Sequence, residues 1–458
     1  MLMAHFMFIR GNRNKRLFHD IGAELERKGH QVHLIQLELN ELLMKTTIPT
    51  VFLPNHVAKE EYPISDKELM DLQIYNITFT KRVLQKEIPL SELRMYKRYM
   101  AALDHLLDKY NIEVICLFNG YHWIDQICRY LAKKKGLRTY FFEDGLFRPY
   151  TITCDPNGIN ACSSVPRDFS FYQDMEVDRP RLMKFMFRPE EESLKQLKRE
   201  NLVKVASAKL LSMAGSLLRI HPNYFAHINF WQGLKYFVHK KWYSRRKEDE
   251  VDLRGEYIFL PFQVSRDTQI FYHSPHIQSM EQLLEITLKA VEQYNQTYHR
   301  QIKVIVKEHP EDLSRQNYQS LKNKYTNVQF VQKYRMDKLL KASLAVVTVN
   351  STVGIEALAH YKKVITLGDA LYNIDPLVER CPHPDLLYQS LQKSLSTPLS
   401  IDKIEKFLYY LRFHYQTEGV LNRPNKQTAK NLANRLEDYE RGVLDESDWN
   451  HSRKVRID

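Results

Sequence analysis

Residues 4–37 read AHFMFIRGNRNKRLFHDIGAELERKGHQVHLIQL, and this stretch predicts a βαβ unit. Two short apolar runs, residues 4–9 and 31–37, have the length of buried strands. Between them, apolar residues recur at helical spacing, at Leu17, Phe18, Ile21 and Leu25. Gly29 follows as a helix stop. A strand, helix and strand in this order are typical of a parallel α/β sheet.

The same alternation continues along most of the chain. A helical stretch at 124–135 ends at Gly136, and one at 280–298 lies in the second half. Further buried-strand runs occur at residues 113–118, 138–142, 256–262, 302–307, 327–331, 344–349 and 363–367. The pattern predicts two Rossmann-like, doubly wound units facing a central cleft. Ligands of such sheets bind beyond the carboxyl ends of the strands, so we expect the chemistry there.

These runs divide the chain into four predicted segments. Residues 1–175 form an N-terminal Rossmann-like domain, and residues 251–400 form a C-terminal one. Residues 176–250 interrupt the alternation as a basic helical segment between the two domains. Residues 401–458 are expected to form C-terminal helices and a tail.

Composition excludes several classes of protein. The 458 residues carry 67 Lys and Arg against 55 Asp and Glu, a net charge of +12, and 43% of them are hydrophobic, which rules out a disordered or fibrous chain. Five cysteines without a CxxC pair fit neither a zinc ribbon nor a full disulfide set, and they favour a reducing cytosol. The first nine residues do not resemble a signal peptide, and no run of 18 apolar residues predicts a membrane span. Neither GxGxxG nor GxxxxGK[ST] occurs, which argues against a dinucleotide dehydrogenase and a P-loop NTPase.

Two carboxylates follow the strand at 138–142. Glu143 and Asp144 come directly after it, then Gly145, and Arg148 is close behind. Active sites of doubly wound sheets lie at such strand ends. The alternative is a turn with a structural Arg–carboxylate pair, and the pattern alone does not decide between the two.

Residues 151–168 read as a loop rich in hydroxyls and amides, which suits recognition of a polyhydroxylated ligand. Its polar residues include Asp155, Asn157, Asn160, Ser163, Ser164 and Asp168. The alternative is an ordinary Asp-Pro-Asn-Gly turn in which Asp155 bonds the backbone. On the pattern alone, the turn is favoured.

Two strand ends of the second unit carry groups that suit phosphate binding. Lys307 and His309, followed by Pro310, come after one strand, and both side chains can donate to phosphate oxygens. Another strand runs into the sequence Asn350, Ser351, Thr352, Val353, Gly354, Ile355 and Glu356. There Ser351 or Thr352 caps a helix and forms an anion site, and Glu356 could accept from ribose hydroxyls. The alternatives are a structural histidine and a plain capped helix.

Two further segments are candidates. The loop after residue 262 carries Gln263, Asp267 and Gln269, which could contact the donor sugar or the acceptor, unless it is simply a solvated loop. Residues 230–247 interleave aromatic and basic residues, which is typical of contact with an anionic membrane surface. No named nucleic-acid-binding motif accompanies this charge, and a basic helix packed on its own domain is an equal alternative.

In this order, the motifs resemble the bacterial capsular polysaccharide synthesis proteins of the KpsS/KpsC family of β-Kdo transferases, the KpsS branch most closely. The resemblance covers roughly residues 4–380. It rests on FNGYHW around Asn119, EDGLFRP at 143–149, TITCDPNGINACSSVPRDFSFY at 151–172, LPFQVSRDTQI at 260–270, KEHP at 307–310 and NSTVGIEAL at 350–358. It implies a GT-B-like arrangement and retaining transfer of Kdo, or a related nonulosonate, from a CMP-sugar to a lipid-linked acceptor.

The resemblance also implies roles for the candidate residues. Asp155 would be the nucleophile, Glu143 and Asp144 would orient or deprotonate the acceptor hydroxyl, and Arg148 would pair with the donor carboxylate. The nucleotide would be held by Lys307, His309, Pro310, Asn350, Ser351, Thr352, Gly354 and Glu356. Donor sugar or acceptor would meet Asn119, Asn160, Ser163, Ser164, Gln263, Asp267 and Gln269. No metal or other cofactor is expected, because CMP is already a good leaving group.

The family further implies a cytoplasmic protein held peripherally at the inner face of the cytoplasmic membrane. Capsule assembly or export proteins would be its partners, and nucleic acid would not. Two alternatives stay open: an NDP-sugar-dependent glycosyltransferase of the same fold, and a non-catalytic assembly or lipid-binding component.

Overall fold

The computed structural model describes residues 3–9, 15–195, 202–222, 242–243, 245–312, 316–421 and 425–443. The chain forms two compact units. Unit 1 comprises Met1–Ser164, Met183–His227 and Arg412–Asp458, and unit 2 comprises Val165–Leu182 and Ile228–Leu411. These bounds differ from the predicted segments, because the chain returns to unit 1 at Arg412. Residues 412–421 and 425–443 therefore complete the first unit instead of forming a separate segment.

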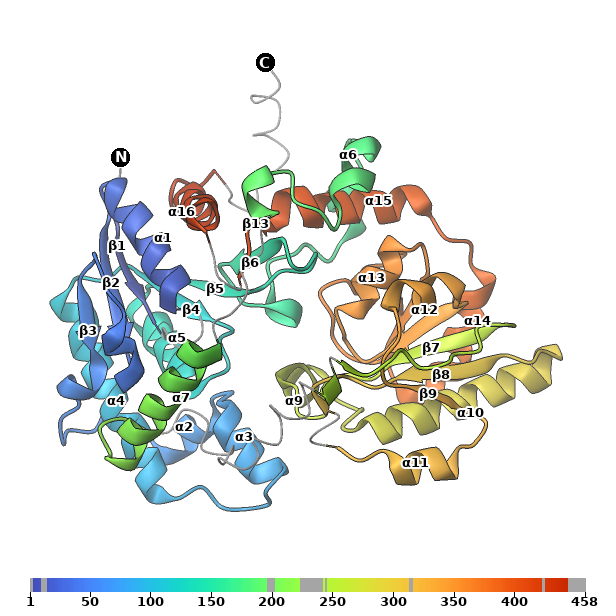
Figure 1. Ribbon diagram of the computed structural model, residues 1–458, viewed down its shortest axis with the longest axis horizontal. Coiled ribbons are helices and arrows are strands. Elements are labelled where there is room, and N and C mark those ends of the chain that lie inside the picture. Colours follow the sequence, from blue (N-terminus) through green and yellow to red (C-terminus); the bar gives the residue numbers. More distant parts are fainter. Residues whose placement is uncertain are drawn as a thin grey trace. The chain divides into compact units, whose positions relative to one another are not determined.

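Unit 1 is built on a seven-stranded sheet of order β13-β6-β5-β4-β1-β2-β3 (Figure 1). Its strands are β1 His5–Phe8, β2 Gln31–Gln36, β3 Thr50–Phe52, β4 Val114–Phe118, β5 Arg138–Asp144, β6 Thr151–Asp155 and β13 Thr417–Glu418. Its α-helices are α1 Lys15–Arg27, α2 Asp66–Asp71, α3 Tyr75–Arg82, α4 Leu90–Lys109, α5 Trp123–Lys135, α7 Leu202–Leu217 and α16 Lys426–Glu440. Its 3₁₀ turns are η2 Leu39–Leu43, η3 Leu53–His56, η4 Asn160–Cys162 and η6 Glu192–Leu194.

Unit 2 is built on a six-stranded parallel sheet of order β12-β11-β10-β7-β8-β9. Its strands are β7 Tyr257–Pro261, β8 Lys303–Lys307, β9 Gln329–Val331, β10 Ala345–Thr348, β11 Lys363–Thr366 and β12 Glu379–Arg380. Its helices are α9 Thr268–His273, α10 Met280–Tyr298, α11 Gln319–Lys324, α12 Met336–Ala342, α13 Val353–Ala359, α14 Leu387–Ser396 and α15 Ile401–Tyr410, with 3₁₀ turns η5 Phe169–Tyr172 and η8 Pro384–Leu386. Helix α6, Arg179–Phe185, and the π-helical turn Leu411–Tyr415 cross between the units.

The predicted α/β class with two doubly wound sheets is confirmed. Each predicted strand run overlaps an observed strand, and the helix predicted at 280–298 is α10. Gly29 and Gly136 end α1 and α5 with φ values of 92° and 68°, a left-handed conformation that glycine adopts most easily. One prediction was wrong: residues 151–168 are not all loop. Their first five form β6, which pairs antiparallel with β5.

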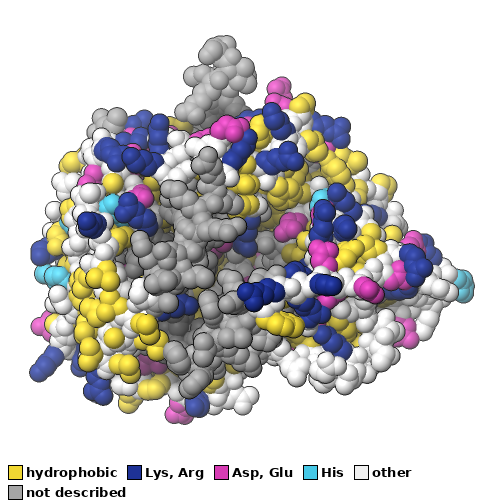
Figure 2. Space-filling view, viewed as in Figure 1, with side chains coloured by type: hydrophobic (Ala, Val, Ile, Leu, Met, Phe, Trp, Pro, Cys, Tyr) yellow, Lys and Arg dark blue, Asp and Glu magenta, His cyan; other side chains and the backbone are white. Residues whose placement is uncertain are grey.

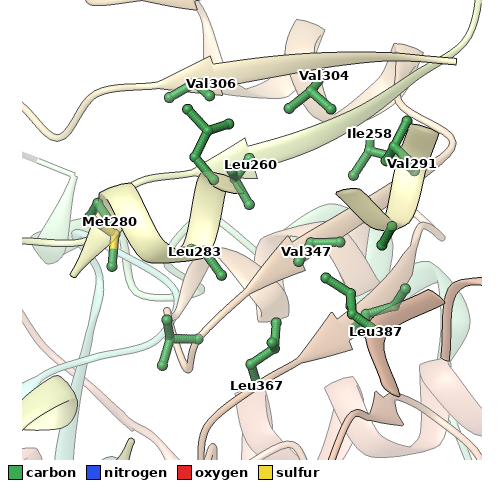
Figure 3. Packing of buried hydrophobic residues seen from close by; sticks show 14 of the residues in the cluster. Ile258, Leu260, Met280, Leu283, Val291, Val304, Val306, Val347, Leu367 and Leu387 are labelled. Carbon is green, nitrogen blue, oxygen red and sulfur yellow. The ribbon is translucent and has the colours of Figure 1, made fainter. Parts of the chain in front are cut away.

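Successive side chains of the parallel strands point to opposite faces of the sheet, and the core of unit 2 is built from them. On one face of the sheet, Ile258 and Leu260 of β7 pack beside Val304 and Val306 of β8. Figure 3 shows these side chains meeting Met280 and Leu283 of α10. Helices α12 and α13 lie on the opposite face (Figure 1). Burial on both faces explains why these strands read as continuous apolar runs.

One face of the sheet in unit 1 is covered by α1 and α16, which pack against each other. Phe8, Phe18 and Phe142 meet there, with Phe18 5.3 Å from Phe142 between ring centroids. The C-terminal helix therefore belongs to the first core, although about 400 residues separate it from α1.

Both sheets have a topological switch point, which is a pair of neighbouring strands from which the later strands are added towards opposite edges of the sheet. It lies between β1 and β4 in unit 1 and between β7 and β10 in unit 2. Ligands of open α/β sheets bind at the carboxyl ends of strands beside such points. Asn119 follows β4, and Gln263 and Asn350 follow β7 and β10.

Candidate functional site

In unit 1, the structure joins Asn119 and Glu143 at the carboxyl ends of β4 and β5. Asn119 Nδ2 donates to Glu143 Oε2 over 2.5 Å, and the Asp144 backbone N–H donates to Glu143 Oε1 over 2.9 Å. Asn119 has a φ of 70°, a left-handed conformation that asparagine tolerates better than most residues. Each Glu143 oxygen thus has one donor and keeps capacity for another.

Burial raises the pKa of Glu143, and the hydrogen bonds from Asp144 and Asn119 oppose this shift. The residue as a whole is nevertheless partly exposed at the end of β5. A carboxyl group whose pKa burial has raised can accept or donate a proton closer to neutral pH than an ordinary glutamate. Glu143 is therefore the strongest acid–base candidate in unit 1.

A tight turn fixes the chain after Glu143. The Gly145 backbone N–H donates to the Thr151 carbonyl oxygen over 3.0 Å, and a Cβ on Gly145 would overlap that carbonyl group. Arg148 is exposed, and its Nε donates to the Gly145 carbonyl oxygen over 3.2 Å. Among the described residues, Arg148 forms no hydrogen bond or close ion pair with a carboxylate, but its charge acts on Glu143 and lowers the pKa of that group. Arg148 therefore presents its charge at the surface.

Asp155 has a different environment. It is fully buried at the end of β6, and its Oδ1 accepts from the backbone N–H groups of Asn157 over 2.8 Å and Gly158 over 3.0 Å. Its Oδ2 accepts from Ser164 N–H over 2.8 Å, Ser164 Oγ over 2.9 Å and Tyr415 Oη over 2.8 Å. Burial raises the pKa of Asp155, and these hydrogen bonds oppose the shift. In this arrangement the carboxylate holds the 155–164 loop, as the turn interpretation predicted.

The antiparallel pairing of β5 and β6 relates the two carboxylates. Asp155 lies opposite Phe141, and Thr153 lies opposite Glu143. Directly paired residues point to the same face, so Asp155 and Glu143 share one face of the sheet, two residues apart along the strand. On this face, the Gln416 side chain donates to Thr153 Oγ1 over 2.9 Å.

Sequence reasoning missed the contribution of Tyr415 and Gln416. They lie 260 residues or more beyond the loop they support, and no motif marks them. Of the other predicted contacts, Asn160 starts η4, and its carbonyl oxygen accepts from the Ser163 backbone N–H over 3.1 Å. Ser163 Oγ is buried and has no hydrogen-bond partner among the described residues.

In unit 2, Gln263 and Asn350 meet across the switch point. Gln263 Nε2 donates to Asn350 Oδ1 over 2.9 Å, and the Asn350 backbone N–H donates to Gln263 Oε1 over 3.0 Å. Asn350 Nδ2 also donates to the Gln269 carbonyl oxygen over 3.0 Å. The structure therefore brings three of the predicted ligand contacts together at the carboxyl edge of β7 and β10.

Gln269 is almost fully buried beside this pair. Neither its side-chain oxygen nor its side-chain nitrogen has a hydrogen-bond partner among the described residues. Its backbone is fixed, because Asp267 Oδ1 accepts from the Gln269 N–H over 2.9 Å and caps α9. A buried amide without partners is costly, so this group is suited to bonding a ligand.

The residues predicted to bind phosphate at the start of α13 differ in their contacts. The Ser351 hydroxyl accepts from the Val353 N–H over 3.2 Å, so Ser351 caps α13, while the Thr352 side chain makes no capping bond. A Cβ on Gly354 would overlap the ring of Tyr372, which gives this glycine a packing role. Glu356 lies half-exposed in the first turn of α13.

Lys307 and His309 lie on the other side of β7, after β8. Lys307 is buried, its Nζ is 3.5 Å from the Gln332 carbonyl oxygen, and burial lowers its pKa. His309 is half-exposed, and its Nδ1 accepts from the Glu311 N–H over 3.2 Å, while Pro310 is exposed. Asp312, which sequence reasoning missed, accepts from the Ser265 N–H over 2.7 Å and so ties the loop after β8 to the loop after β7.

Most of the basic and aromatic segment at 230–247 lies outside the described residues. Within the described part, Tyr243 Oη donates to the Gln332 carbonyl oxygen over 3.0 Å, and Arg246 forms an ion pair of 2.7 Å with Asp249. Trp242 is exposed beside them. This end of the segment therefore packs on unit 2. The predicted tail from residue 444 onward also lies outside the described residues.

Among the described residues, no group of three or more His, Cys, Asp or Glu side chains is arranged to hold a metal ion. In the same part of the chain, no helix is both long and apolar enough to cross a membrane.

Two doubly wound units with polar side chains at their switch points place the protein among the open-sheet α/β proteins. Comparison with known proteins identifies the family within this class. Residues 113–385 match the family model of the capsule polysaccharide biosynthesis proteins, and the chain belongs to this family. The resemblance noticed in the sequence motifs is thereby confirmed.

Two curated relatives align over most of the chain. It is 29% identical over 415 residues to protein FixF of Sinorhizobium fredii, covering 86% of this chain and 87% of FixF. It is 28% identical over 345 residues to the capsule polysaccharide export protein KpsS of Escherichia coli, covering 71% of this chain and 83% of KpsS. A solved KpsC structure from Thermosulfurimonas dismutans, a beta Kdo 2,7 transferase, aligns at 12% identity with a TM-score of 0.40, over 95% of this chain and 99% of that one. A structural similarity of that size carries no conclusion about this chain.

Proposed function

We propose that the protein is a glycosyltransferase of capsule or surface polysaccharide synthesis that takes a CMP-activated sugar as donor, Kdo or a related nonulosonate. The observation that carries the proposal is the Gln263–Asn350 pair at the switch point of unit 2, with the unsatisfied amide of Gln269 beside it. Membership of the capsule polysaccharide biosynthesis family supports the substrate class. The lipid-linked acceptor and the cytoplasmic membrane face follow from the resemblance to the KpsS branch.

In this proposal, unit 2 binds the donor. Asn350 and Gln263 form a rigid polar floor, Gln269 bonds the donor, and His309 and Ser351 contact the phosphate with help from Thr352. Lys307 contributes positive charge from its buried position and no direct contact, because its amine is turned towards Gln332.

Unit 1 supplies the acid–base chemistry. The acceptor hydroxyl oxygen forms a bond to the anomeric carbon, the bond from that carbon to the CMP phosphate oxygen breaks, and CMP leaves with the electron pair. The proton of the hydroxyl passes to Glu143, which Asn119 orients. Asp144 and Arg148 lie at the same strand end and meet the acceptor or the donor carboxylate.

Retention of configuration needs either a covalent intermediate on a carboxylate or attack from the face that CMP leaves. Asp155 can be the nucleophile only if one oxygen gives up its present donors, since both are engaged. We propose that CMP departs without a bound metal, because a nucleoside monophosphate is already a good leaving group.

A thermal-shift panel tests the donor class. The purified full chain is melted with CMP, UMP, UDP, GDP and ADP, since a ligand that binds only the folded state raises Tm. We expect a rise with CMP that His309→Ala weakens. His105→Ala, at an exposed position of α4, serves as the control and keeps the rise. A rise with UDP or GDP alone would replace the proposal with an NDP-sugar transferase, and no rise at all would favour a non-catalytic component.

A further inference from the structure

A second surface of unit 1, formed by α7 and η2, exposes large apolar side chains. Five leucines, which we call the α7 surface, are between 47% and 81% exposed: Leu42, Leu43, Leu210, Leu217 and Leu218. Leu210 and Leu217 are seven residues apart and so lie on the same side of α7. Figure 2 shows hydrophobic side chains gathered on the left of the molecule, where α7 lies in Figure 1. Contiguous apolar patches of this kind mark interaction sites in soluble proteins.

The polarity of η2 is inverted relative to a water-facing turn. Glu41 is only 1% exposed, and its Oε2 accepts from the Leu37 backbone N–H over 2.7 Å. Glu38 is also buried, with Asn40 Nδ2 donating to its Oε2 over 3.3 Å. The two leucines that follow Glu41 point outward instead. A turn that buries its carboxylates and exposes its leucines is suited to contact with an apolar partner instead of water.

The two elements form one rigid surface. Asn40 Nδ2 donates to the Ala208 carbonyl oxygen of α7 over 3.0 Å. Gly215 allows close packing at the other end, since a Cβ there would overlap His221 and press on Leu39. The leucines of η2 and α7 are therefore held together rather than scattered.

The charge of the residues around the α7 surface indicates which partner it binds. Residues 202–222 contain Lys204, Lys209 and Arg219 and no Asp or Glu. Lys209 and Arg219 are exposed beside the leucines, and the whole chain carries a net charge of +12. Exposed leucines beside exposed basic residues, with the nearby Glu38 and Glu41 buried, match an anionic bilayer, where leucines enter the acyl boundary and cations meet phosphate groups.

We propose that the α7 surface docks unit 1 onto an anionic lipid bilayer, without crossing it. The inference rests on the proposed function, because it supplies the route by which a lipid-linked acceptor would reach the carboxylates of unit 1. It assigns the contact to residues 39–43 and 207–222, whereas the sequence had pointed to residues 230–247.

Vesicle co-sedimentation tests the assignment. The full chain is mixed with vesicles of phosphatidylcholine alone or with about 30% phosphatidylglycerol, at low and high salt. We expect binding to the anionic vesicles that weakens with salt and falls at least about tenfold in Leu217→Asp/Leu218→Asp. The matched control is Leu90→Asp, a leucine of unit 1 that is 63% exposed at the start of α4 and lies outside the α7 surface.

A gain-of-signal variant guards against loss by misfolding. Leu217→Trp is expected to gain fluorescence quenching by brominated lipids over the wild type, and Leu90→Trp is not. Wild-type binding by Leu217→Asp/Leu218→Asp would overturn the proposal. Conversion of a dimer to a monomer by the same change, without an effect on vesicles, would also overturn it in favour of a second copy of the chain. The CMP-induced rise in Tm is independent of lipid, so its retention separates failure of this proposal from failure of the proposed function.

Discussion

Two glutamines six residues apart test the donor site of unit 2 most sharply. Gln263 and Gln269 are both almost fully buried, yet they differ in hydrogen bonding. The amide of Gln263 is bonded to Asn350 on both its oxygen and its nitrogen, while that of Gln269 has no partner among the described residues. Methionine has a similar size and lacks the amide, so the two changes to methionine should shift stability in opposite directions.

Gln263→Met leaves the Asn350 N–H and side-chain oxygen without their partner in a buried site. Each orphaned group costs about 1–3 kcal/mol, so we expect a loss of roughly 3 kcal/mol and a fall in Tm of about 6–12 °C for a unit of this size. Gln269→Met removes an amide that is desolvated without compensation. We expect it to stabilise the ligand-free protein by about 1 kcal/mol, or roughly 2–4 °C in Tm.

Thermal denaturation of the full chain with and without CMP measures both effects. At CMP concentrations near 100 times its Kd, binding stabilises the wild type by about 2.7 kcal/mol, and Gln269→Met should lose most of this gain. If Gln269→Met lowered the Tm of the ligand-free protein as much as Gln263→Met does, the Gln269 amide would be satisfied without ligand. If it kept the full CMP effect, Gln269 would not contact the donor. Either result would contradict the role of Gln269 in donor binding.

Three further changes test the chemistry. Asp155→Asn places an amide where five donors now converge on a carboxylate, so unit 1 should lose about 3 kcal/mol in urea denaturation; unchanged stability with loss of transfer would identify a nucleophile instead. Because burial raises the pKa of Glu143, its contribution to stability is present below the ordinary glutamate range and is lost as the pH rises through the raised pKa. If Glu143 is the catalytic base, kcat/KM falls on acidification, and it does so at a higher pH than with an ordinary glutamate. The same acidic fall of kcat/KM in Glu143→Gln would show that another group is the base. Treatment with EDTA should leave turnover unchanged, and a loss restored by a divalent cation would contradict the proposed metal-free departure of CMP.

The sequence was most informative where local pattern and burial agree. The parallel strands are buried on both faces, so they appear as short apolar runs, and glycines in the left-handed conformation end α1 and α5. Strand β6 escaped notice because its polar residues, such as Thr153 and Asp155, form hydrogen bonds on one face of the sheet and resemble a loop in sequence.

Contacts between residues far apart in the chain could not be predicted from the sequence. Tyr415 holds Asp155 from 260 residues away, and Asp312 joins two loops that separate strands bring together. The opposite states of Gln263 and Gln269 are invisible in the sequence for the same reason, since only the fold decides which amide finds a partner. The candidate residues could thus be named from motifs, but their bonded or open state required the structure.

The most direct test of the central claim is CMP release from CMP-Kdo by the purified full chain in the presence of bacterial membrane lipids, with mass spectrometry of the lipid fraction. We expect that the wild type releases CMP and adds a Kdo residue to lipid, and that Glu143→Gln does so at least about 100-fold more slowly while keeping the CMP-induced rise in Tm. Equal rates for Glu143→Gln and the wild type, or transfer only from an NDP-sugar, would contradict it.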